Sequence, residues 1–174
     1  MRGAKFQILL FLAGISFTTS AQAPYTRFHR ISLEEGLSHS LVNGFVEDEQ
    51  GFLWFGTQEG LNRYDGYEFK VYQAGKTKRS PSKNWISAMY RDHYGQIWIF
   101  YQGIGLDRFD PFHETFHTYN PNSLMPGSIS SNRYPDEGNY IYSVFFEDAD
   151  SNLWIGTERG VNKYIRNDDR FDVA

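Results

Sequence analysis

The stretch DEQGFLWFGTQEGLNRYDG, residues 48–66, decides the fold. The turn cluster DEQG precedes the apolar run FLWFGT, and a second turn and another short apolar run follow, which is the pattern of antiparallel strands joined by tight turns. Alternate side chains of a strand point to opposite faces, so Trp54 and Gly56 share one face while Phe55 lies on the other. Because both faces carry apolar residues, we expect both faces of the sheet to be covered.

The same unit recurs twice. Residues 90–110 read YRDHYGQIWIFYQGIGLDRFD, and residues 146–164 read FEDADSNLWIGTERGVNKY. In each unit an Asp lies six residues before a Trp, and the spacings between the Trp residues are 44 and 56. Four-stranded propeller blades have about this period, whereas leucine-rich repeats are shorter and helical repeats need a 3.6-residue periodicity that is absent here. The recurring structural positions are Asp48, Gly51, Trp54, Gly56, Asp92, Gly95, Trp98, Asp148, Trp154 and Gly156.

The repeat predicts an all-β fold, a partial three-blade β-propeller of four-stranded antiparallel blades. Propellers close with about 4–8 blades, so three units leave two blade faces uncovered. Two turn-rich connections should leave the blade stack, and they either bind a ligand or are simply solvated. The propeller is expected over residues 24–174, with repeats at about 41–72, 85–119 and 141–172 and long connections at 73–84 and 120–139.

Each recurring residue has an expected role. Gly51 and Gly95 suit a left-handed turn position, and in the third unit Ser151 stands there with Asn152 next, a residue that can take this conformation. The recurring Asp side chains can accept hydrogen bonds from turn amides. The glycine two residues after the Trp lets a neighbouring blade approach closely. The second unit lacks this glycine, which leaves the close contact there in question.

The N-terminus predicts export. Arg2 and Lys5 precede an apolar run over residues 8–17, and small residues follow as far as residue 23, which is the order of a secretory signal peptide. The run is too short to span a bilayer, which takes about 20 apolar residues. We therefore expect residues 1–23 to be a signal peptide, and the sequence shows no other candidate membrane span.

Composition narrows the possible partners. The chain has 174 residues and a formal net charge of −4, and removing residues 1–23 would remove two of its 17 basic residues and none of its 21 acidic ones. A negative surface repels phosphate backbones, which disfavours a nucleic-acid partner. The chain has no cysteine, so its stability has to come from packing, to which 4 Trp, 12 Tyr and 15 Phe can contribute large buried areas.

HETFH, residues 113–117, matches the H-E-x-x-H zinc motif letter for letter. That motif needs both His residues on one face of a helix. The repeat instead places His113 and His117 in the last strand of the second unit, where four residues span roughly 13 Å. Two ligands that far apart cannot share an ion at about 2 Å each. We therefore predict no metal site, and no cofactor.

Two pairs of adjacent carboxylates, Glu34–Glu35 and Asp168–Asp169, could suggest a glycosidase. Sequence neighbours point to opposite faces of a strand, so they make poor acid/base pairs, and glycosidases need two carboxyl groups about 5–9.5 Å apart on the substrate. Surface solvation is the expected role. With no other catalytic set in a suitable context, the chain is not expected to be an enzyme.

A basic residue also recurs in each unit, as Arg63, Arg108 and Lys163. These side chains could form a basic ring that receives an acidic sugar, or they could pair with carboxylates at blade edges. Pairing is the favoured interpretation.

Residues 48–66 resemble the two-component regulator propeller repeat, and residues 28–42, FHRISLEEGLSHSLV, are similar to the opening of the periplasmic sensor region of hybrid two-component systems in gut-type bacteria. The resemblance implies two propellers, a β-sandwich, a membrane span and a histidine kinase, with carbohydrates or their breakdown products as the signal. The chain would then be an N-terminal fragment of a periplasmic sensor, and any kinase activity would belong to downstream domains.

The sequence leaves three candidate functions for the chain. The first is carbohydrate sensing, in which exposed aromatic side chains stack on sugar rings. The second is a non-catalytic interaction scaffold, whose open faces bind the remaining blades or a partner chain. The third, a lyase built on a propeller, lacks a convincing catalytic set. The candidate stacking residues are Trp85, Tyr101, Tyr134 and Tyr140.

Overall fold

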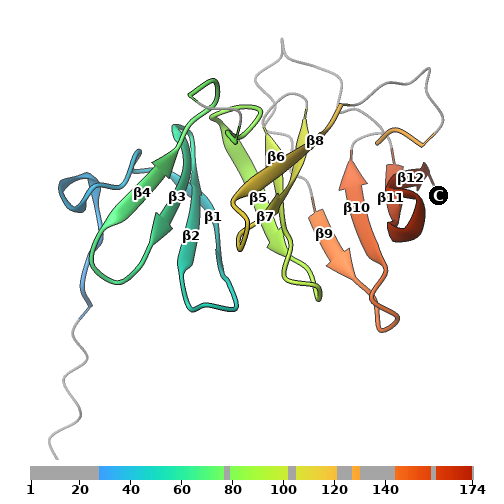
Figure 1. The fold of residues 1–174 in the computed structure, drawn as a ribbon, viewed down its shortest axis with the longest axis horizontal. Helices are drawn as coiled ribbons and strands as arrows, with labels where there is room; N and C mark the ends of the chain where they lie inside the picture. Colours follow the sequence, from blue (N-terminus) through green and yellow to red (C-terminus); the bar gives the residue numbers. More distant parts are fainter. Residues whose placement is uncertain are drawn as a thin grey trace, which may run out of the picture. The chain divides into compact units, whose positions relative to one another are not determined.

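The computed structural model describes residues 28–76, 79–101, 105–120, 127–129, 144–157 and 160–173. The chain divides into two compact parts, Met1–Arg30 and Ile31–Ala174, and all the strands belong to the second. The predicted signal peptide lies outside the described residues. The second part contains three four-stranded sheets (Figure 1), called the first, second and third sheet in chain order.

Each sheet is an antiparallel meander in which every strand pairs with the next along the chain. The first sheet consists of β1 (Val42–Glu47), β2 (Leu53–Thr57), β3 (Gly60–Tyr64) and β4 (Phe69–Tyr72). The second consists of β5 (Ile86–Arg91), β6 (Ile97–Tyr101), β7 (Leu106–Asp110) and β8 (Thr115–Tyr119). The third consists of β9 (Val144–Glu147), β10 (Leu153–Thr157), β11 (Gly160–Ile165) and β12 (Arg170–Val173). The predicted all-β fold of four-stranded antiparallel blades is confirmed.

Two short 3-10 helices are the only helices among the described residues, η1 (Leu33–Glu35) and η2 (Arg166–Asp168). Glu34 and Glu35 therefore lie in a helical turn, and the expectation that they occupy a strand was wrong. The Glu35 carboxylate accepts hydrogen bonds from the backbone N–H and the hydroxyl of Ser32, which forms a capping box at the start of η1.

In every sheet one aspartate joins the first turn to the tryptophan. Oδ1 of Asp48 accepts hydrogen bonds from the backbone N–H groups of Gln50 at 2.9 Å and Phe52 at 3.0 Å, and its Oδ2 accepts from Nε1 of Trp54 at 2.7 Å. The second and third sheets repeat this arrangement, with 2.9 Å between each carboxylate and its indole nitrogen. The six-residue spacing between Asp and Trp thus reflects a direct contact that the spacing alone does not reveal.

The turn that follows each aspartate contains a left-handed residue. This residue is Gly51 at φ 85°, Gly95 at φ 79° and Ser151 at φ 60°. In the third sheet the serine itself adopts the left-handed conformation. Asn152 instead donates its side-chain amide to both oxygens of Asp148.

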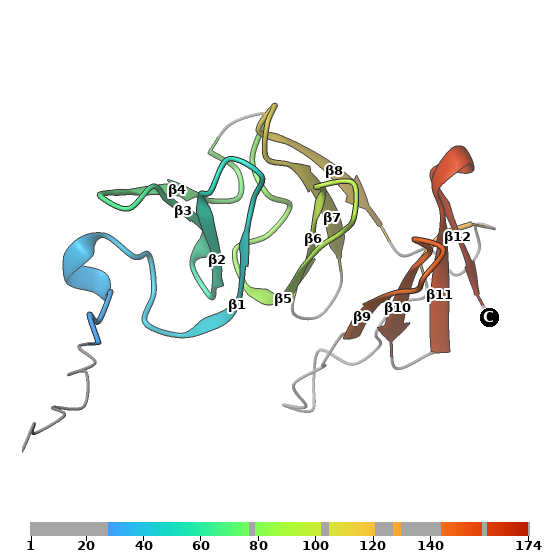
Figure 2. The same ribbon diagram turned by 90° about the horizontal axis from the view of Figure 1, so that it is seen from below.

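The hydrophobic cores lie between successive sheets. One core joins residues of the first and second sheets, and another joins residues of the second and third. β5 contacts both β1 and β9, and Figure 2 shows the sheets as separate layers. We call the contact of the first two sheets the first junction and that of the last two the second junction.

An aromatic pair forms the centre of each junction. The ring of Phe109 meets Trp54 edge-on, with centroids 4.8 Å apart, and Tyr164 meets Trp98 in the same way at 4.7 Å. Both tryptophans are completely buried. Such edge-to-face contacts contribute about 0.5–1.5 kcal/mol beyond the area that they bury.

The two junctions differ in how closely the neighbouring sheets approach each other. A Cβ built on Gly56 would lie 2.5 Å from both Cγ2 of Ile86 and Sδ of Met89, so this glycine is required by the packing of the second sheet. The second sheet has Phe100 at the same register position, opposite the start of its third strand. Phe100 is buried in the core of the second junction, so a ring fills the space there.

A charged pair also crosses each junction. Arg63 of β3 binds Glu114 of the second sheet at 3.1 Å, and Arg108 of β7 binds Asp169 of the third at 3.0 Å. Burial alone would raise the pKa of Asp169, but hydrogen bonds from Tyr119 and Tyr164 and the charge of Arg108 outweigh burial and lower it. The predicted pairing of basic residues with carboxylates is confirmed for these two arginines.

Replacing Asp92 by alanine should destabilise the protein by about 3 kcal/mol, because it leaves the buried indole N–H of Trp98 and the turn amides without an acceptor. Asp148→Ala should cost less, because Asp148 and Trp154 are partly exposed to water. Urea unfolding followed by circular dichroism measures both effects. Asp150→Ala, on the exposed part of a turn, is the control, and equal losses for Asp92→Ala and Asp148→Ala would contradict this account.

Gly56→Ala should lower the free energy of unfolding by about 1–3 kcal/mol, because the added methyl group overlaps side chains of the second sheet. Gly156→Ala should have little effect, since the nearest atoms to its added Cβ are 3.7 Å away. Paired thermal melts of the two variants test this difference, and a destabilisation of similar size at both positions would refute it.

Candidate functional site

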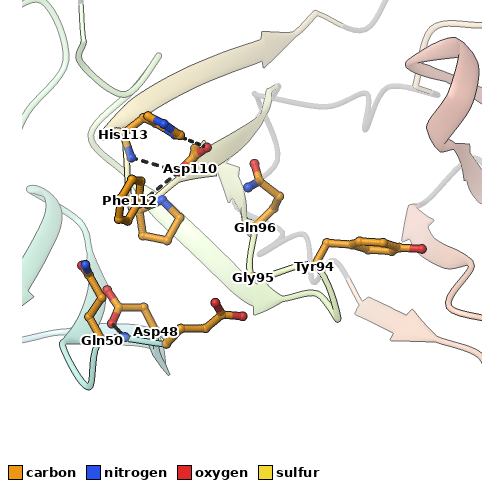
Figure 3. A pocket seen from close by; sticks show the side chains of 10 residues that line it. Asp48, Gln50, Tyr94, Gly95, Gln96, Asp110, Phe112 and His113 are labelled. Carbon is orange, nitrogen blue, oxygen red and sulfur yellow. Dashed lines mark hydrogen bonds and ion pairs between the residues drawn. The ribbon is translucent and has the colours of Figure 1, made fainter.

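A cleft of about 270 Å³ lies between turns of the first and second sheets. Three turns line it, the β1–β2 turn, the β5–β6 turn and the β7–β8 turn, and Figure 3 shows their side chains around the cleft. The lining residues are Asp48, Glu49, Gln50, Tyr94, Gly95, Gln96, Asp110, Pro111, Phe112 and His113. Each of these turns joins two paired strands, so the sheets position the residues that line the cleft.

Phe112 supplies the apolar surface of the cleft, and 72% of this residue's surface is exposed. The ring of Tyr94 points away from Phe112, toward the third sheet (Figure 3). Side-chain amides of Gln50 and Gln96 and several carboxylates supply polar groups. An aromatic ring beside a few polar groups is the usual composition of a small-molecule site.

Asp110 is held as a carboxylate at one wall of the cleft. Its Oδ1 accepts hydrogen bonds from the backbone N–H groups of Phe112 and His113, both at 3.0 Å, and its Oδ2 contacts Nδ1 of His113 at 2.9 Å. Burial tends to raise the pKa of Asp110, but these contacts with His113 and Phe112 outweigh burial and lower it. Asp110 is therefore ionised at neutral pH, and the contacts orient the turn that carries Phe112 (Figure 3).

Two further carboxylates lie at the opposite wall. Glu49 pairs with Arg91 at 2.8 Å and remains largely exposed. Asp48 is almost completely buried, and its Oδ2 accepts the indole hydrogen of Trp54. A carboxylate oxygen has two lone pairs, so Oδ2 can accept a second hydrogen bond. The cleft therefore presents acceptors and favours hydroxyl, amide or ammonium groups over anions.

At the second junction the side chain of Arg166 occupies the position that corresponds to this cleft. Arg166 lies 3.2 Å from Oδ2 of Asp92, and its guanidinium stacks 3.9 Å above the ring of Tyr94. Its counterpart at the first junction is Pro111, because each is the second residue after an equivalent aromatic of the third strand. The proline side chain cannot reach Asp48, so the cleft at the first junction stays open. At the second junction Arg166 fills the equivalent position.

A second cleft, of about 350 Å³, lies beside β4 and has a different charge. Lys70, Lys76 and Arg79 line it together with Glu114, which binds Lys70 at 2.6 Å. This cleft includes part of the predicted connection 73–84 and would suit an anionic group better than the first cleft does.

The stacking residues predicted from the sequence do not meet at this site. Trp85 is partly exposed but is not among the residues that line the first cleft. Tyr101 is completely buried, and its hydroxyl donates to Oδ2 of Asp107 at 2.7 Å, so the expectation that it is exposed was wrong. It lies in β6, whose two faces are both covered by neighbouring sheets. Tyr134 and Tyr140 lie outside the described residues.

The members of HETFH have separate partners. His113 lies in the β7–β8 turn and binds Asp110, so the expectation that it lies in the last strand was wrong. Glu114 binds Arg63 and Lys70, while His117, in β8, lies 3.5 Å from Asp169. Within the described ranges no group of three metal-binding side chains comes together.

The adjacent Asp168 and Asp169 are likewise divided between Arg170 and Arg108. Asp168 lies in η2 and Asp169 follows it, so the expectation that these two residues occupy a strand was wrong. None of the helices in the described part of the chain is long and apolar enough to cross a membrane.

Comparison with known proteins agrees with this architecture. The family described as two component regulator propeller matches residues 36–59 and 135–159. Histidine kinase P4 of Formosa agariphila is 37% identical over 68 residues, which cover 39% of this chain and 5% of that protein.

A solved structure with the same arrangement is the extracellular domain of a protein described as the hybrid two component system BT3049 from B. thetaiotaomicron. It is 29% identical with a TM-score of 0.71, and the match covers 84% of this chain. This chain spans 20% of the length of that structure. Residues 36–59 and 135–159 thus match the two-component regulator propeller repeat, and the three four-stranded sheets share the propeller architecture of the similar extracellular domain.

Proposed function

We propose that this protein is a ligand-sensing propeller region of a hybrid two-component system, that it acts in the periplasm, and that its ligand is a carbohydrate. The likeness to an extracellular domain of a hybrid two-component system supports the sensing role and a position outside the cytoplasm. The signal-like N-terminus of the sequence supports export. Kinase activity would reside in another part of such a system.

The open cleft at the first junction is the observation that carries the proposal. Its position between two sheets means that a ligand there contacts both, so binding can change how the two sheets are held together. The exposed Phe112 ring offers an apolar surface to the face of a sugar. Asp48, Asp110 and the two glutamines offer hydrogen-bond partners for sugar hydroxyls.

The volume and the charge of the cleft restrict which sugars can bind there. Ligand sites for drug-sized molecules usually measure about 300–1,000 Å³, so a cleft of about 270 Å³ suits one sugar ring, with the rest of a chain outside. The carboxylates would repel uronic or sulfated sugars. A neutral or amino sugar is therefore the proposed ligand class, and the pairing of Arg63 and Arg108 within the fold removes the basic ring that an acidic sugar would need.

Pro111→Arg should weaken sugar binding strongly, because an arginine there can fill the cleft as Arg166 does at the second junction. Isothermal titration calorimetry with neutral, amino and acidic mono- and oligosaccharides should show binding of a neutral or amino sugar by the unmodified protein. The loss with Pro111→Arg should be about tenfold or more, equal to at least 1.4 kcal/mol. Phe112→Ala should weaken binding roughly fivefold through loss of ring contact.

Matched controls separate the cleft from general effects on the fold. Pro111→Ala leaves the cleft open and should bind normally, and Tyr67→Ala removes an exposed aromatic from the equivalent turn of the first sheet, away from the cleft. If no sugar binds, or if binding survives both Pro111→Arg and Phe112→Ala, the proposal is wrong. Binding of an acidic sugar that is lost with Lys76→Ala would place the site in the second cleft and also overturn it.

A further inference from the structure

The second cleft, beside β4, gathers positive charge on a protein whose formal net charge is −4. Lys70, Lys76 and Arg79 line it, and Glu114 is the only carboxylate among the described residues that do so. Such a local excess of positive charge attracts anions even when the rest of the surface repels them. The cleft therefore differs in ligand preference from the first cleft, which presents acceptors.

The charge of Glu114 is already offset by the fold. Its carboxylate lies 2.6 Å from Nζ of Lys70 and 3.1 Å from the guanidinium of Arg63. Burial tends to raise the pKa of Glu114, but Lys70 and Arg63 outweigh burial and lower it. Two cations thus meet one ionised carboxylate, and Lys76, which makes no ion pair with a described residue, adds a further positive charge.

A buried hydroxyl group without a partner lies beside these charges. Tyr72 ends β4, and its ring packs near Trp54 and Phe109, so that only 9% of the residue is exposed. Lys70 and Glu114 lie near its hydroxyl, but neither is placed to form a hydrogen bond with it, and no other described residue does so. Because buried polar groups almost always have a partner, the Tyr72 hydroxyl indicates that a ligand atom belongs here.

The hydroxyl is a hydrogen-bond donor that Lys70 covers. Burial raises the pKa of Tyr72, so the phenol keeps its proton at neutral pH. Lys70 and Tyr72 are two residues apart in β4 and share a face, with Nζ 4.9 Å from the ring centre. The Lys70 side chain is 49% exposed, and its flexible stem can turn outward. An anion that attracts Lys70 away from Glu114 would uncover the hydroxyl and accept its hydrogen.

The donors of the cleft suit a phosphate group better than a carboxylate. An ammonium group has three N–H donors and a guanidinium five, and the phenol adds one. A carboxylate offers two oxygens in one plane and a single charge, whereas a phosphate monoester offers three terminal oxygens and a charge of about −1.5 to −2 at pH 7. The cleft, at about 350 Å³, also has room for the group that carries the phosphate.

We propose that the second cleft binds a phosphate group, as free phosphate or as a phosphate monoester, through Lys76, Arg79 and the hydroxyl of Tyr72. The β7–β8 turn separates this site from the first cleft, because Phe112 lines the first and Glu114 the second. The protein thus has two ligand sites with opposite charge preferences. Phosphate binding does not depend on a sugar in the first cleft.

Isothermal titration calorimetry of the full chain, in a buffer without phosphate, tests the site. Inorganic phosphate and glycerol phosphate should bind about tenfold more tightly than the singly charged methyl sulfate and glucuronate, because the second charge adds to the attraction. Lys76→Ala should weaken phosphate binding roughly fivefold, within the range of a partly exposed ion pair. Lys163→Ala, which removes a basic residue that does not line this cleft, is the matched control and should bind phosphate normally.

Tyr72→Phe separates a ligand-binding role from a structural one. Removal of the hydroxyl should weaken phosphate binding about threefold or more, because a hydrogen bond to a charged group is lost. The same variant should not lower the free energy of unfolding without phosphate, since the hydroxyl has no partner there. Urea unfolding in the absence of phosphate measures this second effect.

The two phosphate probes distinguish the sources of the group. Equal affinities would show that free phosphate is sufficient, and tighter binding of glycerol phosphate would show that the carrying group contributes; both results support the proposal. It is overturned if neither probe binds, if Lys76→Ala and Tyr72→Phe both leave phosphate binding unchanged, or if glucuronate or methyl sulfate binds as tightly as phosphate. A failure to bind any neutral or amino sugar would contradict the proposed function and leave these results unaffected.

Discussion

The bond between an aspartate and a tryptophan indole organises each sheet, and the rest of the structure depends on it. One carboxylate accepts the amides of the first turn and the indole N–H at the same time, so it fixes both the hairpin and the position of the ring. Charge-assisted hydrogen bonds of this kind are stronger than neutral ones. With the indole held in place, the rings of Trp54 and Trp98 form part of the surface on which the next sheet packs.

The fold could be predicted because its information is local and repeated. The Asp-to-Trp spacing, the alternation along FLWFGT and the turn glycines are all visible within about twenty residues, and three copies reinforce one another. It was harder to predict from the sequence which aromatic side chains are exposed to solvent. Tyr101 reads as a surface aromatic near a turn, yet its strand is covered on both faces and its hydroxyl binds Asp107, a contact that only the assembled sheet reveals.

The candidate site could not be predicted for a related reason. Phe112, Gln50 and Gln96 come from three turns on two sheets, and nothing in any single turn indicates that they meet. One signal was present in the sequence, the contrast between Pro111 and Arg166 at equivalent positions of successive units. Interpreting that contrast requires knowing that Arg166 reaches Asp92 of the preceding sheet. A constant scaffold with variable turns is how repeat proteins commonly acquire distinct binding properties.

Because the cores lie between sheets, none of the three sheets has a complete hydrophobic interior of its own among the described residues. Energetic coupling is consequently strongest between nearest neighbours, as in other repeat arrays. Whole blades can then be gained or lost in evolution by duplication or deletion while each surviving interface keeps its chemistry. A protein assembled in this way can vary its length and its specificity almost independently.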